Sequence, residues 1–255
     1  MKTNKIFIIL LLCVFCQCTK SDRPTIIGEN LEFGLTLYSD ACFPEVNDKY
    51  EYPVVPGMEE WNNLDYDIET PWEKFCQLPD SVLKTISTAG LIDALIYAPL
   101  FTGFSMISSD GTALKWHRHY GAFNSAKELF QRENADDALV AYYELVRLNC
   151  IKSSSKDTER MEGLEMLFTK QQILDKMGHE SKKQAIVAIL ANYKKFPDDL
   201  NRIFPMAFIM YADKYEPIVK YSQDNEKEFN CILNGYFYSF DQADLITSYA
   251  ENYIK

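Results

Sequence analysis

The stretch that decides the fold is QAIVAILANYKKFP, which spans residues 184–197. Its large apolar residues recur at intervals of three and four positions: Ile186, Ile189, Leu190 and Tyr193. This spacing places them on one face of an α-helix, and Pro197 ends that helix. Because a helix with one apolar face buries it against other elements, the stretch predicts helix-on-helix packing.

Helix start and stop signals continue on both sides of this stretch, from residue 71 to residue 255. The expected N-cap residues are Ser87, Asn124, Asn134, Asp157 and Asp241. Thr169 and Gln172 are expected to form a capping box. Strand signals are nearly absent after residue 60, and short loops between helices favour antiparallel neighbours. The sequence therefore predicts an all-α fold: a multi-helix array of short antiparallel helical hairpins, either a bundle or a short α-solenoid, with an irregular N-terminal arm.

Residues 204–212, FPMAFIMYA, are apolar on every face of the helix that they are expected to form. A helix that is apolar all round is normally surrounded by neighbours, so this one is expected to be central and buried. On that basis, Phe208→Ala should cost roughly 3–5 kcal/mol of stability through lost burial and the cavity left behind.

The N-terminal arm has a different pattern. Apolar residues at every second position predict one short extended segment: Leu31, Phe33, Leu35 and Leu37. Prolines interrupt the rest of the arm, and Trp61 is expected to anchor it on the helical body. We expect three parts: a signal peptide at 1–17, a lipid tether and irregular arm at 18–70, and a helical domain at 71–255.

The first residues have the features of an export signal. Two lysines precede an apolar run from Ile6 to Cys16. As a helix the run is about 16 Å long, too short for a bilayer core of about 30 Å but suited to a secretory signal. It ends next to Cys18, where a polar stretch begins, and this arrangement resembles the signal peptide of bacterial lipoproteins. The resemblance implies that Cys18 is acylated and anchors the protein in the cell envelope, at the periplasmic face of the outer membrane or at the cell surface.

A second resemblance covers the start of the helical body. The matching residues are Leu78-Pro79, Ser87-Thr88, Leu91-Ile92 and Tyr97-Ala98-Pro99-Leu100-Phe101, followed by FNSAKEL at Phe123–Leu129. They resemble a pattern in uncharacterised proteins of Bacteroidota. Since the matching positions are mostly structural, the resemblance implies an all-helical body and a bacterial origin, and it implies no chemistry.

Composition and motifs exclude several classes of function. The chain carries 37 acidic and 26 basic residues, a net charge of -11, so no basic field is present and nucleic acid is not an expected partner. No phosphate-binding loop, nucleophile elbow or dinucleotide fingerprint occurs, so no cofactor is expected. His117 and His119 lie about 200° apart on the expected helix and cannot bind one ion together, so no metal is expected either.

Two small groups of residues suggest specific contacts. An exported protein can oxidise its thiols, and Cys42 and Cys76 are candidates for a disulfide that pins the arm; the alternative is that they pack as small apolar thiols. Tyr236, Tyr238 and Phe240 crowd one short stretch. They are candidate ligand-contact aromatics, and packing in the core is the alternative.

Two hypotheses about function remain. The first is a lipid-anchored, non-enzymatic binding or assembly module of the cell envelope, whose partners are the membrane and either another envelope protein or a glycan. The second is an envelope hydrolase that acts on polysaccharide or peptidoglycan through paired carboxylates. Candidate acidic pairs are Glu59-Glu60, Asp65 with Asp67, and Asp198-Asp199. A carboxylate cleft with a raised pKa favours the hydrolase, and an apolar groove favours the binding module.

Overall fold

The described part of the chain is mostly helical. The computed structural model describes residues 24–62, 75–99, 120–121, 123–146, 155–195, 203–233 and 240–255. Three strands come first: β1 (Ile26–Asn30), β2 (Leu35–Tyr38) and β3 (Glu45–Val46). Twelve helices follow within those residues: α2 (Glu59–Asn62), α3 (Asp80–Leu83), α4 (Thr88–Ile96), α6 (Asn124–Leu129), α7 (Ala135–Glu144), α9 (Ser155–Leu167), α10 (Gln171–Leu174), α11 (His179–Lys195), α12 (Ile203–Ala212), α13 (Glu216–Asp224), α14 (Glu226–Leu233) and α15 (Phe240–Tyr253).

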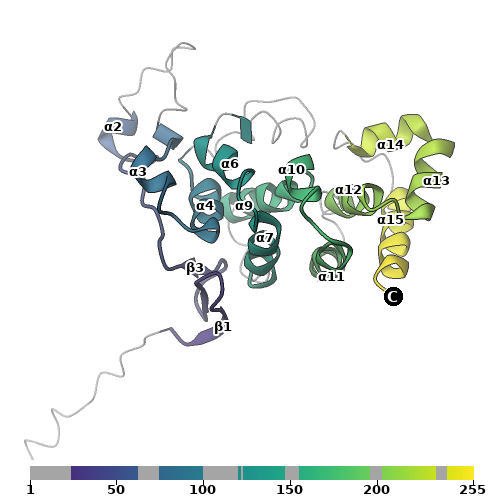
Figure 1. Cartoon of the computed structure of the whole chain (residues 1–255), viewed down its shortest axis with the longest axis horizontal. Helices are drawn as coiled ribbons and strands as arrows, with labels where there is room; N and C mark the ends of the chain where they lie inside the picture. The colour runs from purple at the N-terminus through teal and green to yellow at the C-terminus, as the bar shows by residue number, and fades with distance from the viewer. Residues whose placement is uncertain are drawn as a thin grey trace, which may run out of the picture.

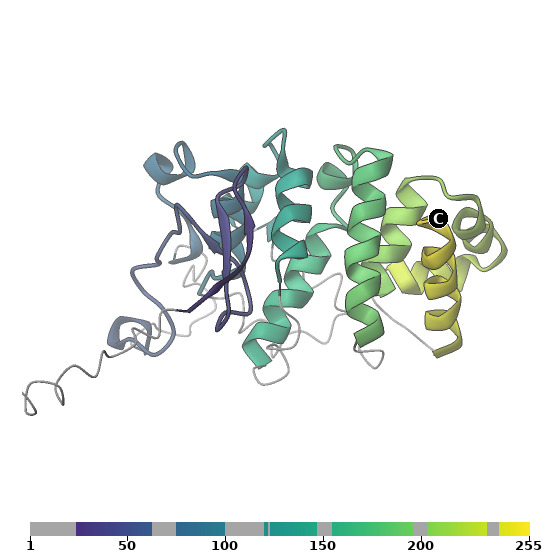
Figure 2. The same cartoon turned by 90° about the horizontal axis from the view of Figure 1, so that it is seen from below.

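The helices succeed one another along the long axis of the molecule. Figure 1 shows the chain running from the sheet and α3 at one end, through α7 and α11, to α13, α14 and α15 at the other. Helix α11 packs on α7 and also on α12 and α15. Figure 2 shows the long helices of the middle and C-terminal parts standing side by side. The prediction of a multi-helix body is therefore confirmed.

The prediction of an all-α fold is wrong at the N-terminal end. Strands β1, β2 and β3 form an antiparallel sheet in that order. The expected extended segment is a hairpin, because Leu31 lies in the turn and is 83% exposed, whereas Leu35 and Leu37 of β2 are buried. Gly34 closes the turn at a φ of 64°, a conformation that favours glycine. The alternation predicted one strand and did not indicate the partner strands on either side.

The arm joins the same apolar core as the helices. Phe43, Val46 and Tyr52 are buried in that core. The hydroxyl of Tyr52 donates to the backbone carbonyl of Ala94 in α4 at 3.0 Å. Trp61 is 8% exposed and packs edge-on against Phe75. The sheet and the following loop are therefore held against one side of the helical body.

The start of α4 is fixed by a residue of the arm. Ser87 Oγ accepts from the backbone N–H of Gly90 at 2.9 Å, which confirms the predicted cap. The Asp48 carboxylate accepts from the N–H of Ser87, and from its hydroxyl at 2.8 Å. Gly90 permits this close approach, because a Cβ there would lie 2.7 Å from Asp48 Oδ1 and 2.6 Å from Cγ1 of Ile86.

Other predicted caps are engaged in different contacts. Asn124 is the first residue of α6, and its side chain donates to Leu78 O at 2.8 Å and accepts from Leu78 N–H at 2.9 Å. Thr169 donates to the carbonyl of Met166, and α10 begins after Lys170, so the predicted capping box does not form. In both cases the polar side chain forms hydrogen bonds with backbone groups outside the start of the helix.

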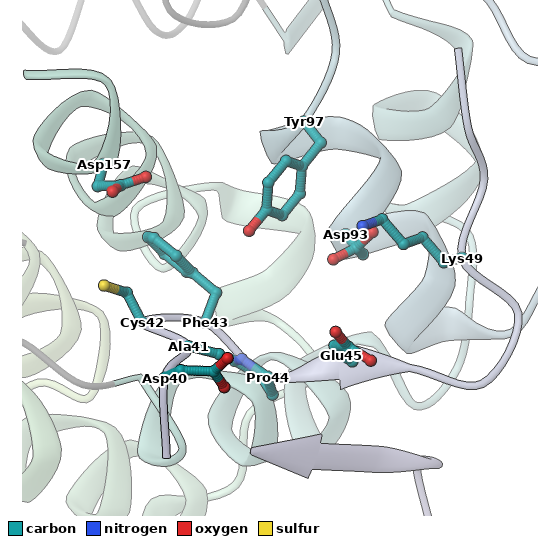
Figure 3. Close-up of a pocket in the computed structure, with 10 residues that line it drawn as sticks. All are labelled: Asp40, Ala41, Cys42, Phe43, Pro44, Glu45, Lys49, Asp93, Tyr97 and Asp157. Atoms are coloured by element: carbon teal, nitrogen blue, oxygen red, sulfur yellow. The ribbon is translucent and has the colours of Figure 1, made fainter. Parts of the chain in front are cut away.

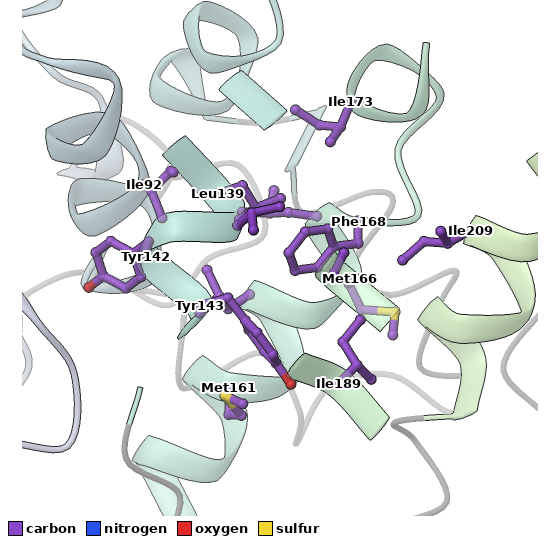
Figure 4. Packing of buried hydrophobic residues seen from close by; sticks show 14 of the residues in the cluster. Ile92, Leu139, Tyr142, Tyr143, Met161, Met166, Phe168, Ile173, Ile189 and Ile209 are labelled. Atoms are coloured by element: carbon purple, nitrogen blue, oxygen red, sulfur yellow. The ribbon is translucent and has the colours of Figure 1, made fainter. Parts of the chain in front are cut away.

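The core of the helical body is packed around α7, α9 and α11 (Figure 4). The stripe on α11 is buried as predicted: Ile186, Ile189, Leu190 and Tyr193. Tyr143 and Phe168 are fully buried, with ring centroids 5.5 Å apart. The Tyr143 hydroxyl donates to Glu165 Oε1 at 2.7 Å and accepts from Asn192 Nδ2 at 2.9 Å, so this buried polar group is satisfied.

Helix α12 is the apolar segment expected to be buried on all sides. Most of it is buried, including Phe204 and Ile209. Phe208 is only half-buried, however, and Tyr211 is 42% exposed. The prediction that Phe208 is a central core residue is therefore wrong, because one face of α12 is open to a surface pocket that Phe208 and Tyr211 line.

Candidate functional site

The most unusual buried group is a carboxylate in the middle of an apolar helix. All nine residues of α4 are buried, and Asp93 is 2% exposed. Its Oδ1 accepts a hydrogen bond from the Tyr142 hydroxyl at 3.1 Å. Its Oδ2 has no hydrogen-bond partner among the described residues. A buried carboxylate oxygen without a donor is costly, so Asp93 marks a candidate functional site.

Burial changes the acidity of this group. Desolvation raises the pKa of Asp93 from its ordinary 3.8 to about 6. The hydrogen bond from Tyr142, and the positive charges of Lys49 and Arg160, offset only part of that effect. Asp93 therefore changes its charge close to physiological pH, as groups at functional sites often do.

Asp93 lies in the wall of a pocket of about 280 Å³ between the arm and the helices. The pocket is lined by Asp40, Ala41, Cys42, Phe43, Pro44, Glu45, Lys49, Asp93, Tyr97 and Asp157. Figure 3 shows Asp93 and Lys49 on one side, Asp157 on the opposite side, and the hydroxyl of Tyr97 between them. The arm, α4 and α9 each contribute residues to this pocket. These segments lie far apart in the sequence, so the sequence did not show that they meet.

Tyr97 is positioned by cations and by its place in the chain. It follows α4 directly and lies one helical turn after Asp93, so both side chains face the same direction. The Arg160 guanidinium lies 4.3 Å from its ring centroid, and Lys49 Nζ lies 5.4 Å from it. Arg160 also pairs with Asp157 at 2.7 Å. Burial, with a further contribution from Asp93, raises the pKa of Tyr97 to about 12, so its hydroxyl stays protonated and can donate.

The charges of the lining determine what the pocket can accept. Four carboxyl groups line it against a single lysine: Asp40, Glu45, Asp93 and Asp157 oppose Lys49. The lining is therefore negative, and Asp93 Oδ2 requires a hydrogen-bond donor. In the described ranges no three His, Cys, Asp or Glu residues are grouped as metal ligands. A small organic group that donates hydrogen bonds and carries positive charge fits this arrangement.

Some of the residues singled out from the sequence lie within the described part of the chain, and others lie outside it. Cys18, Tyr236 and Tyr238 lie outside the described residues, as do His117, His119, Asp65, Asp67, Asp198 and Asp199. Phe240 is the first residue of α15 and is 64% exposed. Glu59 and Glu60 are exposed at the start of α2.

Cys42 and Cys76, the candidate disulfide pair, are both thiols in the structure. Cys42 is half-buried in the pocket wall. Cys76 is fully buried in the core and does not line the pocket.

Asp93 was not identified from the sequence. The signal was available, because Asp93 is the one charged residue in GLIDALI, residues 90–96. A lone acid in an apolar helix indicates a buried carboxylate only when every face of that helix is covered, and the covering arm was not predicted to reach α4.

Comparisons with known proteins found no match to this chain. No protein-family model matches the chain, and neither a curated protein nor a solved structure matches it.

Proposed function

We propose that this protein is a lipid-anchored binding protein of the cell envelope whose helical body binds a small organic ammonium ion in the Asp93 pocket. The observation that carries the proposal is Asp93, which lines the pocket and whose buried Oδ2 atom has no donor among the described residues. An ammonium group supplies three N–H donors and a positive charge, and it would satisfy this oxygen with a charge-assisted hydrogen bond.

The remaining features of the pocket agree with such a ligand. Its volume of about 280 Å³ suits a small molecule rather than a polymer. Asp40 and Glu45 also line the pocket and provide carboxylates for the second polar end of a ligand, whereas Asp157 is paired with Arg160 at 2.7 Å. An amine on a glycan or on a side chain of another envelope protein is compatible with these features.

Cadaverine and 1,5-pentanediol provide a matched test of the ligand class. Both have two hydrogen-bonding ends on a five-carbon chain, and only cadaverine is cationic. In isothermal titration calorimetry at pH 7.5 we expect cadaverine to bind and pentanediol to bind at least tenfold more weakly. Asp93→Asn should weaken cadaverine binding at least tenfold, because a charged hydrogen bond contributes about 1.5–3 kcal/mol. Lys49→Gln should strengthen it, since the competing cation is removed.

Asp224→Asn, at an exposed position on α13, is the matched control and should leave the affinity unchanged. Equal binding of cadaverine and pentanediol would contradict the ammonium ligand. Cadaverine binding that survives Asp93→Asn would place the ligand elsewhere.

A hydrolase is the second candidate function, and one observation favours it. The raised pKa of Asp93, about 6, suits a general acid, and other carboxylates line the same pocket. In that case peptidoglycan or a polysaccharide should be cleaved with release of reducing ends, and Asp93→Asn should abolish the release. Binding of cadaverine without any such cleavage supports the non-enzymatic function.

The anchoring part of the proposal rests on the N-terminal sequence. In the described part of the chain no helix is long and apolar enough to cross a membrane. We expect Cys18→Ser to move the protein from the membrane fraction to the soluble fraction, whereas Cys16→Ser should not. Immunoblots of the two fractions measure this, and mass spectrometry of an unmodified mature N-terminus would contradict it.

The proposal also includes the arrangement of the helices in the body. We infer that α4 to α15 form a short array of antiparallel helical hairpins, supported by the sequential packing of α7, α11, α12 and α15. Such arrays often present binding surfaces along their length.

A further inference from the structure

Three large apolar side chains are exposed on the N-terminal hairpin. Ile26 is 48% exposed, Ile27 is 51% exposed and Leu31 is 83% exposed. Ile26 and Ile27 lie in β1, and Leu31 lies in the turn that follows it. The other exposed large apolar residues of the described ranges occur singly along the chain: Met58, Val187, Tyr211 and Phe240. A group of exposed apolar side chains on one element, unlike isolated ones, indicates an interaction surface.

The hairpin stands apart from the helices on one side of the molecule. Figure 1 shows β1 below the row of helices, and in Figure 2, the view from below, the hairpin lies in front of the body. Gly28 brings the strand close to the body, because a Cβ there would lie 2.8 Å from Cδ2 of Leu145. The strand therefore contacts the body at Gly28 and leaves Ile26 and Ile27 exposed.

The backbone edge of β1 is a poor template for a further strand. Within the described residues β1 is an edge of the sheet, since the strand order is β1-β2-β3. Its register with β2 shifts between Ile26 and Gly28, so Ile27 is an extra residue in the strand. Such a bulge disrupts the regular row of N–H and C=O groups with which another chain would pair. The exposed apolar side chains, rather than the backbone edge, are therefore the feature that a partner would contact.

The length of chain after the proposed lipid anchor limits where this surface can lie. Thr25 is fixed to the sheet, because its N–H donates to Ser39 Oγ at 3.1 Å and its carbonyl accepts from Ser39 N–H at 2.8 Å. Cys18 is seven positions before Thr25, and seven positions of chain span at most about 25 Å. An anchor at Cys18 therefore keeps the hairpin at a high effective concentration near the bilayer, where even a small apolar contact is populated.

The charge of the hairpin determines which bilayer surface suits it. The chain has a net charge of -11, and Glu29 and Glu32 are exposed next to the apolar side chains. Anionic headgroups repel such a surface. A contact here must come from burial of apolar area at the boundary between headgroups and acyl chains, and a zwitterionic bilayer permits that burial.

We propose that Ile26, Ile27 and Leu31 insert into the interfacial region of a zwitterionic bilayer, which makes the hairpin a second membrane contact beside the lipid. The inference rests on the proposed acylation of Cys18. It adds an orientation to the anchored protein, because the N-terminal sheet then lies against the bilayer.

Tryptophan reporters at two exposed apolar positions test this contact. Ile27→Trp places the reporter on the hairpin, and Val187→Trp on α11 is the matched control, because Val187 is 49% exposed. The full-length acylated protein is reconstituted in phosphatidylcholine vesicles, and mass spectrometry of the same sample verifies the acyl group on Cys18. Lipids brominated in the upper part of the acyl chain quench tryptophans that enter the interface. After subtraction of the wild-type emission, we expect at least threefold more quenching for Ile27→Trp than for Val187→Trp.

A charged neighbour should weaken the contact without unfolding the protein. Ile26→Glu, combined with Ile27→Trp, should reduce the quenching at least twofold, because a carboxylate beside the reporter opposes its entry into the bilayer. Since Ile26 is exposed, this substitution should leave the midpoint of urea denaturation unchanged. Replacing part of the phosphatidylcholine by anionic phosphatidylglycerol should also reduce the quenching.

Acylated protein in which Ile27→Trp is quenched no more than Val187→Trp would overturn the hairpin contact and leave the anchoring intact. An unmodified Cys18 would overturn the anchoring and this inference together. Quenching that requires anionic lipid would contradict an apolar contact. A concentration-dependent dimer that Ile26→Glu abolishes would assign the surface to a second copy of the chain and would also overturn the inference.

Discussion

Asp93→Asn is expected to stabilise the unliganded protein by an amount that depends on pH. Burial raises the folded-state pKa of Asp93 to about 6 from its ordinary 3.8. Between these values the folded protein binds more protons than the unfolded chain, so the unfolding free energy of the wild type falls as pH rises. The stabilising contribution of the protonated group is fully present below about pH 4 and is lost above about pH 6. The difference in unfolding free energy between Asp93→Asn and wild type should therefore grow by about 3 kcal/mol across this interval.

Urea denaturation at a series of pH values from 3.5 to 8 measures this difference in unfolding free energy. This pH range brackets the Asp93 pKa of about 6. The same substitution at exposed Asp224 controls for the loss of a surface charge. A difference that stays constant with pH would mean that Asp93 is not desolvated in the folded state, and the site would lose its main feature. Stabilisation with loss of binding is the trade-off expected of a residue retained for function.

Phe204→Ala is expected to cost 3–5 kcal/mol, far more than Phe208→Ala on the same helix. Phe204 is 1% exposed, so its removal leaves a cavity that neighbouring side chains only partly fill. Phe208 is half-buried in the pocket wall, and Phe208→Ala should cost roughly 1–2 kcal/mol. The two rings pack on each other with centroids 6.0 Å apart, so both substitutions lose the same ring contact.

The midpoint of urea denaturation for the two variants decides this prediction. Equal destabilisation would mean that Phe208 is part of the core and that the face of α12 that carries Phe208 and Tyr211 is closed. Near-neutral Phe204→Ala would mean that α12 is not held by neighbours at all.

Periodicity predicted the helical body better than it predicted the arm. The stripe of α11 and the cap at Ser87 depend on local spacing and local hydrogen bonding, and both are found as predicted. The sheet was missed because strand pairing joins β1 and β2 across a turn that contains Leu31, an apolar residue which alternation assigned to the strand. Local patterns do not state which segments pair.

The candidate site could not be assembled from the sequence for a related reason. Asp40, Asp93 and Asp157 line one pocket although more than fifty residues separate each from the next. The raised pKa of Asp93 arises from burial, which the hydrogen bond from Tyr142 offsets only in part, and both are tertiary effects. The sequence shows a single acid within GLIDALI, and only the packing of α4 shows that this acid is buried.

The most direct test of the ammonium site is a titration of the Asp93 side-chain carboxyl carbon by NMR, with and without cadaverine. Without ligand, the pKa of Asp93 is expected to be about 6. With saturating cadaverine it should fall, because a bound ammonium ion favours the charged carboxylate, and 1,5-pentanediol should lower it much less. A pKa near 3.8 in the unliganded protein, or a pKa of about 6 that cadaverine leaves unchanged, would contradict the proposal that this pocket binds an organic cation through Asp93.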